Sequence, residues 1–145
     1  METHPTGSPE PRSVRLTFRW DGDGVRLSSR TPRRSPAPPS EPLTEPPPGA
    51  ITLELRSPAG EVRYRRFLPE PIPQTLETAD DEGRLRRIPF AAPSGSFTAV
   101  VVPPRSGEVI VVSAGPAVRF AQPGLGGTPG IRGWRELLVT SAERP

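Results

Sequence analysis

The feature that most constrains the fold of this chain is an alternation of apolar and polar residues along segments that prolines and glycines separate. The apolar positions of the first such segment, residues 14–20, are Val14, Leu16, Phe18 and Trp20. Successive side chains of a β-strand point to opposite faces, so this segment is expected to be a strand with one buried face. The alternation resumes at Val25 and Leu27, which predicts that the two segments pair as a hairpin.

Further strands are predicted from the same pattern. They cover residues 51–55, 62–68, two weaker segments around 76 and 85–90, and residues 97–102, 108–114 and 134–142. Two arginines between Tyr64 and Phe67 interrupt the alternation, so a bulge or a strand end is expected there. The last segment also fits one helical turn. Because turns separate short strands and no long helical pattern occurs, the chain is predicted to be all-β, an antiparallel β-sandwich of about seven or eight strands.

Proline and glycine mark the organisation of the chain, with 23 prolines and 14 glycines in 145 residues. Residues 1–12 have no apolar pattern and are expected to form a disordered tail, followed by a single domain over residues 13–145. Eight prolines fall in residues 31–49. Since proline lacks the N–H that a central strand donates, this segment is predicted to be an extended, solvated insertion loop. A second loop, rich in glycine and proline, is expected at residues 115–133.

The stretch Asp21-Gly22-Asp23-Gly24 allows two interpretations, a calcium loop and a hairpin turn. An EF-hand loop beginning at Asp21 needs an oxygen ligand at its fifth position and a glutamate at its twelfth, but these positions hold Val25 and Pro32. Asp-Gly between two alternating segments is, by contrast, a strong hairpin signal. We therefore expect a turn.

Missing residue types exclude several classes of catalytic site. Without cysteine and lysine there is no thiolate nucleophile, no Schiff base and no phosphate-binding Gly-Lys-Ser loop. The one histidine, His4, lies in the expected tail, so a Ser-His-Asp triad has no base. No acidic residue lies on an apolar strand face, where a paired-carboxylate site would need one. The protein is therefore expected not to be an enzyme, and no cofactor is expected.

The composition also bears on the source and the location of the protein. All 19 basic residues are arginine, and asparagine is missing as well, which indicates a GC-rich bacterial genome. Residues 1–13 hold no apolar stretch, so no signal peptide is expected. No run reaches the roughly 18 apolar residues that a membrane span needs. A cytoplasmic protein with no membrane contact is expected.

Two groups of acidic residues are candidates for ligand binding. Asp80, Asp81 and Glu82 are weak candidates for a calcium site, because adjacent like charges more often form a solvated turn. A carbohydrate- or calcium-binding module is the alternative function for the chain. Its candidate residues, on loops at one end of the sandwich, are Trp20, Asp21, Asp23, Asp80 and Asp81.

Outward-facing arginines are candidates for a basic sheet surface, and they are Arg15, Arg19, Arg26, Arg63 and Arg65. Sheets that bind nucleic acid usually add exposed aromatic residues on which bases stack. These strand faces alternate arginine with threonine and serine instead. A solvated sheet face is therefore favoured over a nucleic-acid interface.

The most apolar segments, residues 97–102 and 108–114, are predicted to form a hairpin with each other. Both faces of this hairpin would be apolar, because side chains alternate and the valines are consecutive. One face fills the core and the other needs a cover. Either the C-terminal segment around Trp134 and Leu137 covers it, which is favoured, or another protein does. The candidate partner-binding residues are Val100, Val102, Val109 and Val111.

The strand rhythm of residues 14–29, 51–68 and 97–113 resembles that of immunoglobulin-like and fibronectin-like sandwiches. The resemblance concerns architecture, since the chain lacks a cysteine pair. It implies adhesion, assembly or accessory roles. We therefore predict a non-catalytic interaction or accessory subunit of a larger bacterial assembly, which binds a protein partner or a second copy of itself through the valine-rich hairpin.

Overall fold

The computed structural model describes residues 10–69, 71–73, 75–89, 93–115, 118 and 135–142. Within these ranges the chain forms nine strands in three antiparallel sheets and no helix, which confirms the all-β prediction. His4, Phe90, Trp134, most of the expected tail and nearly all of the loop predicted at 115–133 lie outside the described residues.

Seven of these strands make two sheets. The first sheet has the order β2-β1-β7 and consists of β1 (Ser13–Asp21), β2 (Gly24–Arg33) and β7 (Gly95–Val101). The second sheet has the order β4-β3-β8-β9 and consists of β3 (Ile51–Arg56), β4 (Val62–Leu68), β8 (Val109–Ala114) and β9 (Arg135–Ser141). The remaining two, β5 (Thr75–Ala79) and β6 (Leu85–Pro89), form a two-stranded sheet of their own.

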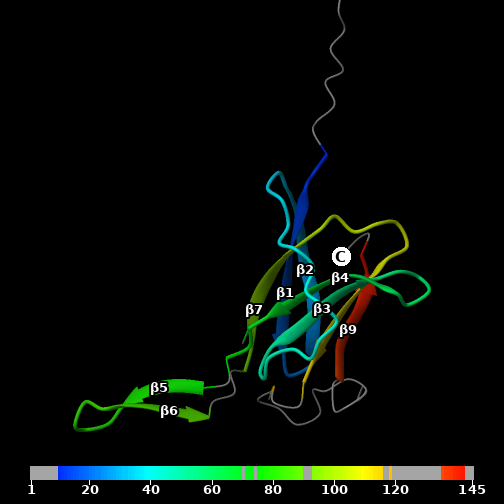
Figure 1. Cartoon of the computed structure of the whole chain (residues 1–145). Helices are drawn as coiled ribbons and strands as arrows, with labels where there is room; N and C mark the ends of the chain where they lie inside the picture. The colour runs from blue at the N-terminus through cyan, green and yellow to red at the C-terminus, as the bar shows by residue number, and fades with distance from the viewer. Residues whose placement is uncertain are drawn as a thin grey trace, which may run out of the picture.

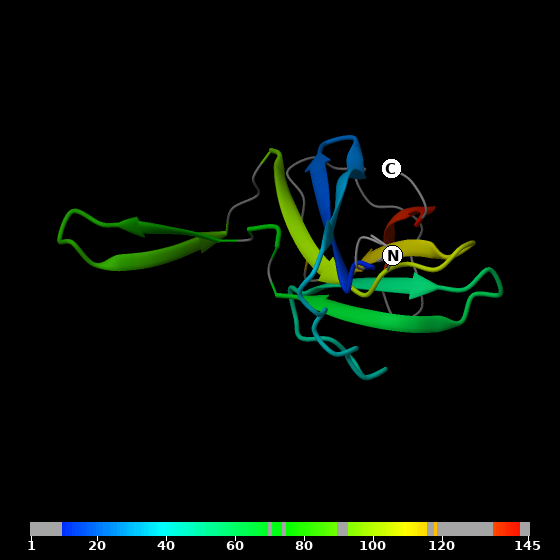
Figure 2. The same ribbon diagram turned by 90° about the horizontal axis from the view of Figure 1, so that it is seen from above.

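The first and second sheets face each other around one apolar core, as in a β-sandwich (Figure 1 and Figure 2). Leu16 and Phe18 of β1 lie in this core with Leu53 and Leu55 of β3 and Ile110 of β8, and all five side chains are fully buried. The alternation read from residues 14–20 is therefore the alternation between core and solvent.

The prediction that residues 97–102 and 108–114 form a hairpin is wrong. β7 pairs with β1 in the first sheet, whereas β8 pairs with β3 and β9 in the second. The connection between them, residues 102–108, therefore crosses from one sheet to the other. The valine-rich hairpin that the sequence indicated does not exist as a surface.

The crossover has a physical reason in its sequence. Pro103 and Pro104 follow one residue after the end of β7 and have no N–H groups, so a ladder between β7 and β8 cannot continue toward the turn. Glu108 then fixes the far end of the connection. Its carboxylate accepts hydrogen bonds from the Arg63 guanidinium at 2.6 and 2.7 Å and from the Arg105 N–H at 2.6 Å. Arg63 also donates to the carbonyl of Pro103 at 3.1 Å, which ties the crossover to β4.

The expected interruption after Tyr64 does not occur, because β4 runs unbroken to Leu68. Its register against β3 shifts only at Leu55/Arg56. The alternation is kept with Arg66 on the inner side and Phe67 on the outer side, where the Arg65 guanidinium lies 4.9 Å from the Phe67 ring centroid. The prediction of a bulge or strand end is wrong, because Arg66 occupies an inner position and its guanidinium is satisfied by the carbonyl of Val100.

Two arginines join the sheets at their open sides. Arg66 of β4 donates to the carbonyl of Val100 on β7 at 2.9 Å, and Arg30 of β2 donates to the carbonyl of Ala142 after β9. Hydrogen bonds from charged groups contribute about 1.5–3 kcal/mol each. The edge strands of the sandwich are thus held together without any ladder between the sheets.

The proline-rich segment differs from its prediction in two respects. β2 extends to Arg33, so three residues of the expected loop are strand, and Pro32 is tolerated because β2 is an edge strand. The extended part, residues 36–44, which we call the strap, lies along β4. The Tyr64 hydroxyl donates to the carbonyl of Pro38 at 2.7 Å, and the Glu41 N–H donates to the carbonyl of Arg65 at 2.8 Å. The strap thus shields the edge of β4, which an exposed strand requires.

Candidate functional site

The β5–β6 hairpin extends away from the sandwich as a separate ribbon (Figure 1 and Figure 2). It carries three exposed large apolar side chains: Leu85 is 76% exposed, Leu76 43% and Ile88 42%. Leu76 and Ile88 lie opposite each other across the two strands. The sequence pattern predicts these two weaker strands as part of the sandwich. The structure instead leaves their leucine and isoleucine side chains as the largest group of exposed apolar side chains among the described residues.

The turn at the tip of this ribbon contains the acidic residues considered for calcium. One Asp80 carboxylate oxygen accepts from the N–H groups of Glu82 at 3.0 Å and Arg84 at 2.9 Å, and the other lies 3.6 Å from the Arg86 guanidinium. Glu82 pairs with Arg84. Gly83 has a φ of 77°, the left-handed conformation that glycine adopts most readily. These contacts show acidic side chains organising a hairpin turn.

The four valines predicted to bind a partner are now distributed over both sheets. Val100, Val102 and Val109 are half-buried, and Val111 is 2% exposed. Val100 belongs to β7 and Val109 and Val111 to β8, so they share no common surface. Their role in binding stays a prediction, without the hairpin on which it was based. The predicted C-terminal strand is confirmed as β9, which lies beside β8 in the second sheet.

The Asp-Gly-Asp-Gly stretch is a hairpin turn, as predicted: Asp21 ends β1, Gly24 begins β2, and the two are opposite each other. The Asp21 carboxylate accepts from the Asp23 N–H at 2.8 Å and from Arg26 at 3.1 Å. These two contacts, the backbone one first, hold the pKa of Asp21 below its usual value. The Asp21 side chain thus stabilises the turn by accepting a hydrogen bond from the backbone two residues later, as in an Asx turn.

Trp20 is a candidate residue of the carbohydrate- or calcium-binding module, but only 3% of it is exposed. Its ring packs in the core under Gly95 of β7, which lies opposite Trp20 across the β1–β7 ladder. The ring therefore has no free face on which a sugar could stack.

The contact between Gly95 and Trp20 leads to a prediction. A Cβ atom at position 95 would lie 2.7 Å from Cζ2 and 2.9 Å from Cε2 of Trp20. We expect Gly95→Ala to destabilise the fold by about 1–3 kcal/mol, the usual cost of overpacking a core. Urea unfolding measures this cost, with Ser96→Ala as the control. If Gly95→Ala unfolds at the same urea concentration as the control, the ring is not held as described.

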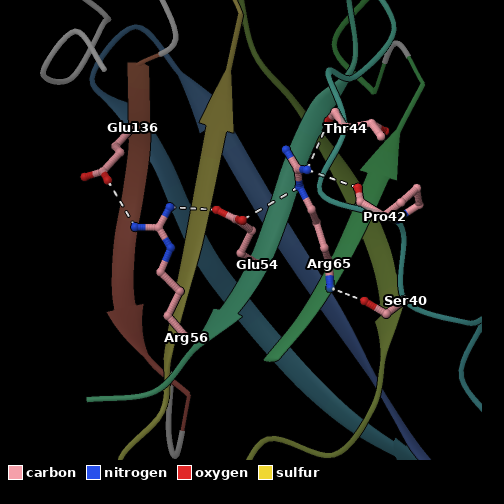
Figure 3. Close-up of polar contacts among 7 residues, drawn as sticks. All are labelled: Ser40, Pro42, Thr44, Glu54, Arg56, Arg65 and Glu136. Atoms are coloured by element: carbon pink, nitrogen blue, oxygen red, sulfur yellow. Dashed lines mark hydrogen bonds and ion pairs between the residues drawn. The ribbon is translucent and has the colours of Figure 1, made fainter. Parts of the chain in front are cut away.

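The arginines expected to form one basic surface are divided between the sheets. Arg63 and Arg65 belong to β4 and pair with Glu108 and Glu54. Figure 3 shows Glu54 between Arg65 and Arg56 on the outer face of the second sheet. Arg56 also reaches Glu136 at 3.5 Å, and Arg65 donates to the strap carbonyls of Pro42 and Thr44. These arginines are structural, and the described side chains of this sheet form no basic surface.

Comparisons with protein-family models, with curated proteins and with solved structures find no match to this chain. Among the residues that the structure describes, no group of three or more His, Cys, Asp or Glu side chains is placed to hold a metal ion. The same residues include no helix with the length and apolar character that crossing a membrane requires.

Proposed function

We propose that this chain is a non-catalytic interaction subunit that binds a protein partner through the β5–β6 ribbon. The observation that carries the proposal is the exposure of Leu76, Leu85 and Ile88 on a ribbon that packs on no other described element. An immunoglobulin-like or fibronectin-like architecture, a bacterial assembly and a cytoplasmic location belong to this proposal.

The energetics of a two-stranded ribbon support binding. An isolated hairpin is marginally stable in water, because it cannot bury enough apolar surface. Burial of one leucine or isoleucine side chain contributes about 1.5–3 kcal/mol. By the register of the two strands, Leu76 and Ile88 lie on one face of the ribbon and Leu85 lies on the other. A partner that covered Leu76 and Ile88 would stabilise the ribbon while forming the complex. The exposed apolar side chains thus favour the complex over the free chain.

The two edges of the ribbon differ in their suitability for a partner. β6 carries Arg86, Arg87 and Pro89, and charges and proline on an edge strand oppose pairing with another strand. β5 has Glu77 as its one charged residue, no proline, and no neighbour other than β6 among the described strands. We therefore propose that the partner adds a strand to the free edge of β5 and covers the apolar side chains beside it.

The proposal is tested by changing the ribbon alone. We expect the double variant Leu76→Glu/Ile88→Glu, which changes the two side chains on one face, to bind the partner at least about 30-fold more weakly than the wild type, since truncated hot-spot residues cost about 2 kcal/mol or more. The partner is captured with the tagged full chain from the source cells and purified. The complex is then rebuilt from the two pure proteins, and its stoichiometry and affinity are measured by light scattering and calorimetry.

The matched control is Leu43→Glu, because Leu43 is also highly exposed, at 74%, but lies in the strap. It should bind as the wild type does, and all variants should unfold at the wild-type temperature. Equal affinity of the ribbon variant and the control would contradict the proposal. So would the lack of any partner that re-forms a complex of fixed stoichiometry.

A further inference from the structure

An open, solvent-exposed cavity lies at one end of the first sheet, where the β1–β2 hairpin meets the start of β7. Its volume is about 420 Å³. Its lining residues are Arg19, Trp20, Asp21, Arg26, Ser94, Gly95 and Ser96. Pockets for small molecules measure roughly 300–1,000 Å³, so this cavity has room for a small ligand.

The strand register explains why two arginines are neighbours at this cavity. Arg19 of β1 lies opposite Arg26 on β2 and opposite Ser96 on β7. All three are exposed on the outer face of the sheet, while the next residue, Trp20, points into the core. A row of two cations and a hydroxyl therefore borders the cavity.

The charges in this row are unbalanced. Arg26 is paired with Asp21 at 3.1 Å, whereas Arg19 has no acidic partner among the described residues. On the second sheet, by contrast, Arg56, Arg63 and Arg65 all have one. Like charges directly opposite each other on neighbouring strands destabilise a sheet. The two arginines and Asp21 leave one net positive charge at the cavity, which an anion would balance.

We propose that this cavity binds a small hydroxylated carboxylate, of the class of uronic acids and hydroxy acids. The Arg19 guanidinium matches a carboxylate in bidentate geometry. The hydroxyls of Ser94 and Ser96 and the remaining acceptor positions of Asp21 suit hydroxyl groups of the ligand. One net positive charge matches a monoanion, and the Asp21 carboxylate repels a phosphate dianion more strongly than it repels a monoanion. Because Trp20 is buried, recognition uses hydrogen bonds and charge, and ring stacking takes no part.

The test uses the full chain and three probes at constant ionic strength: D-glucuronate, neutral D-glucose and inorganic phosphate. Calorimetry measures affinity, and thermal unfolding measures stabilisation by the bound probe. We expect glucuronate to bind and to raise the unfolding temperature, and glucose and phosphate to bind at least about tenfold more weakly, the difference of one charge-assisted hydrogen bond.

Two variants distinguish binding in the cavity from nonspecific attraction of anions to the protein. Arg19→Gln should weaken glucuronate binding by about tenfold or more, because it removes the unpaired guanidinium. Arg15→Gln is the matched control: Arg15 is also an exposed arginine of β1 without a described acidic partner, but it does not line the cavity. Equal losses in the two variants would overturn the proposal, as would phosphate binding as tight as that of glucuronate, or no binding of glucuronate.

Discussion

Replacement of Phe18 by alanine is expected to destabilise this protein by about 3–5 kcal/mol, the usual cost of deleting an aromatic side chain from a core. Phe18 is fully buried and its ring stacks on Phe97 of β7, with 5.1 Å between the ring centroids. The substitution removes contacts within the first sheet and also a fully buried aromatic side chain that this sheet contributes to the core. A domain whose free energy of unfolding is about 5–15 kcal/mol would lose a large part of it.

Urea unfolding checks this expectation. The midpoint should fall while the slope of free energy against urea concentration stays near the wild-type value, because the same chain is exposed on unfolding. Leu85→Ala is the control, since Leu85 is exposed on the β5–β6 ribbon and should change stability by less than about 0.5 kcal/mol. A loss below about 1 kcal/mol in Phe18→Ala would show that the two sheets are not packed around this ring.

The second large effect is expected at Glu108, which is 4% exposed and holds the crossover between the sheets. Glu108→Gln keeps the size of the side chain but removes its charge, which leaves the half-buried Arg63 without its anion. Removal of one partner of a buried ion pair costs about 3–5 kcal/mol. We expect a loss near 3 kcal/mol, measured by urea unfolding at pH 7. Glu77→Gln serves as the control, because the Glu77–Arg87 pair is exposed and should contribute less than about 1 kcal/mol.

The pH dependence gives an independent check of Glu108. Hydrogen bonds from Arg63, and then from the Arg105 N–H, hold its pKa below the ordinary value of 4.5. A carboxyl whose pKa is lowered by folding stabilises the folded state above its unfolded pKa, and this contribution is lost as the pH falls through the folded pKa. The difference in stability between the wild type and Glu108→Gln should therefore be constant above about pH 5 and shrink below 4.5. A difference that does not change with pH would show that the charge of Glu108 does not cause the loss of stability.

Local patterns predicted the strands well, because the signals involved act over a few residues. The period-two alternation of residues 14–20 located β1, and the Asp-Gly turn located its hairpin with β2. The turn around Gly83 likewise joins the two strands expected there. In each case neighbouring residues in the chain determine the structure, so no knowledge of the remaining fold is needed.

The candidate sites were predicted less well, because they depend on which strands become neighbours. The valine-rich segments form strands, but these strands lie in different sheets. Pro103 and Pro104 oppose a hairpin between them, and the Arg63–Glu108 pair holds the connection that crosses from one sheet to the other. An ion pair that joins residues 45 positions apart leaves no local signal. The cavity beside Arg19 was not predicted for the same reason, since it requires Arg26 on one side and the start of β7 on the other. Trp20 was a ligand candidate by residue type alone, and packing made it a core residue.

The amino-acid sequence by itself determined the all-β class, the positions of the strands and the β1–β2 turn, because backbone geometry and side-chain alternation are local properties. The tertiary structure decided the pairing of β7 and β8, the strap along β4, the separation of the β5–β6 ribbon and the division of the arginines into paired and unpaired groups. The physical reason is that strand pairing joins distant residues, and burial and charge balance exist only once those residues are in contact.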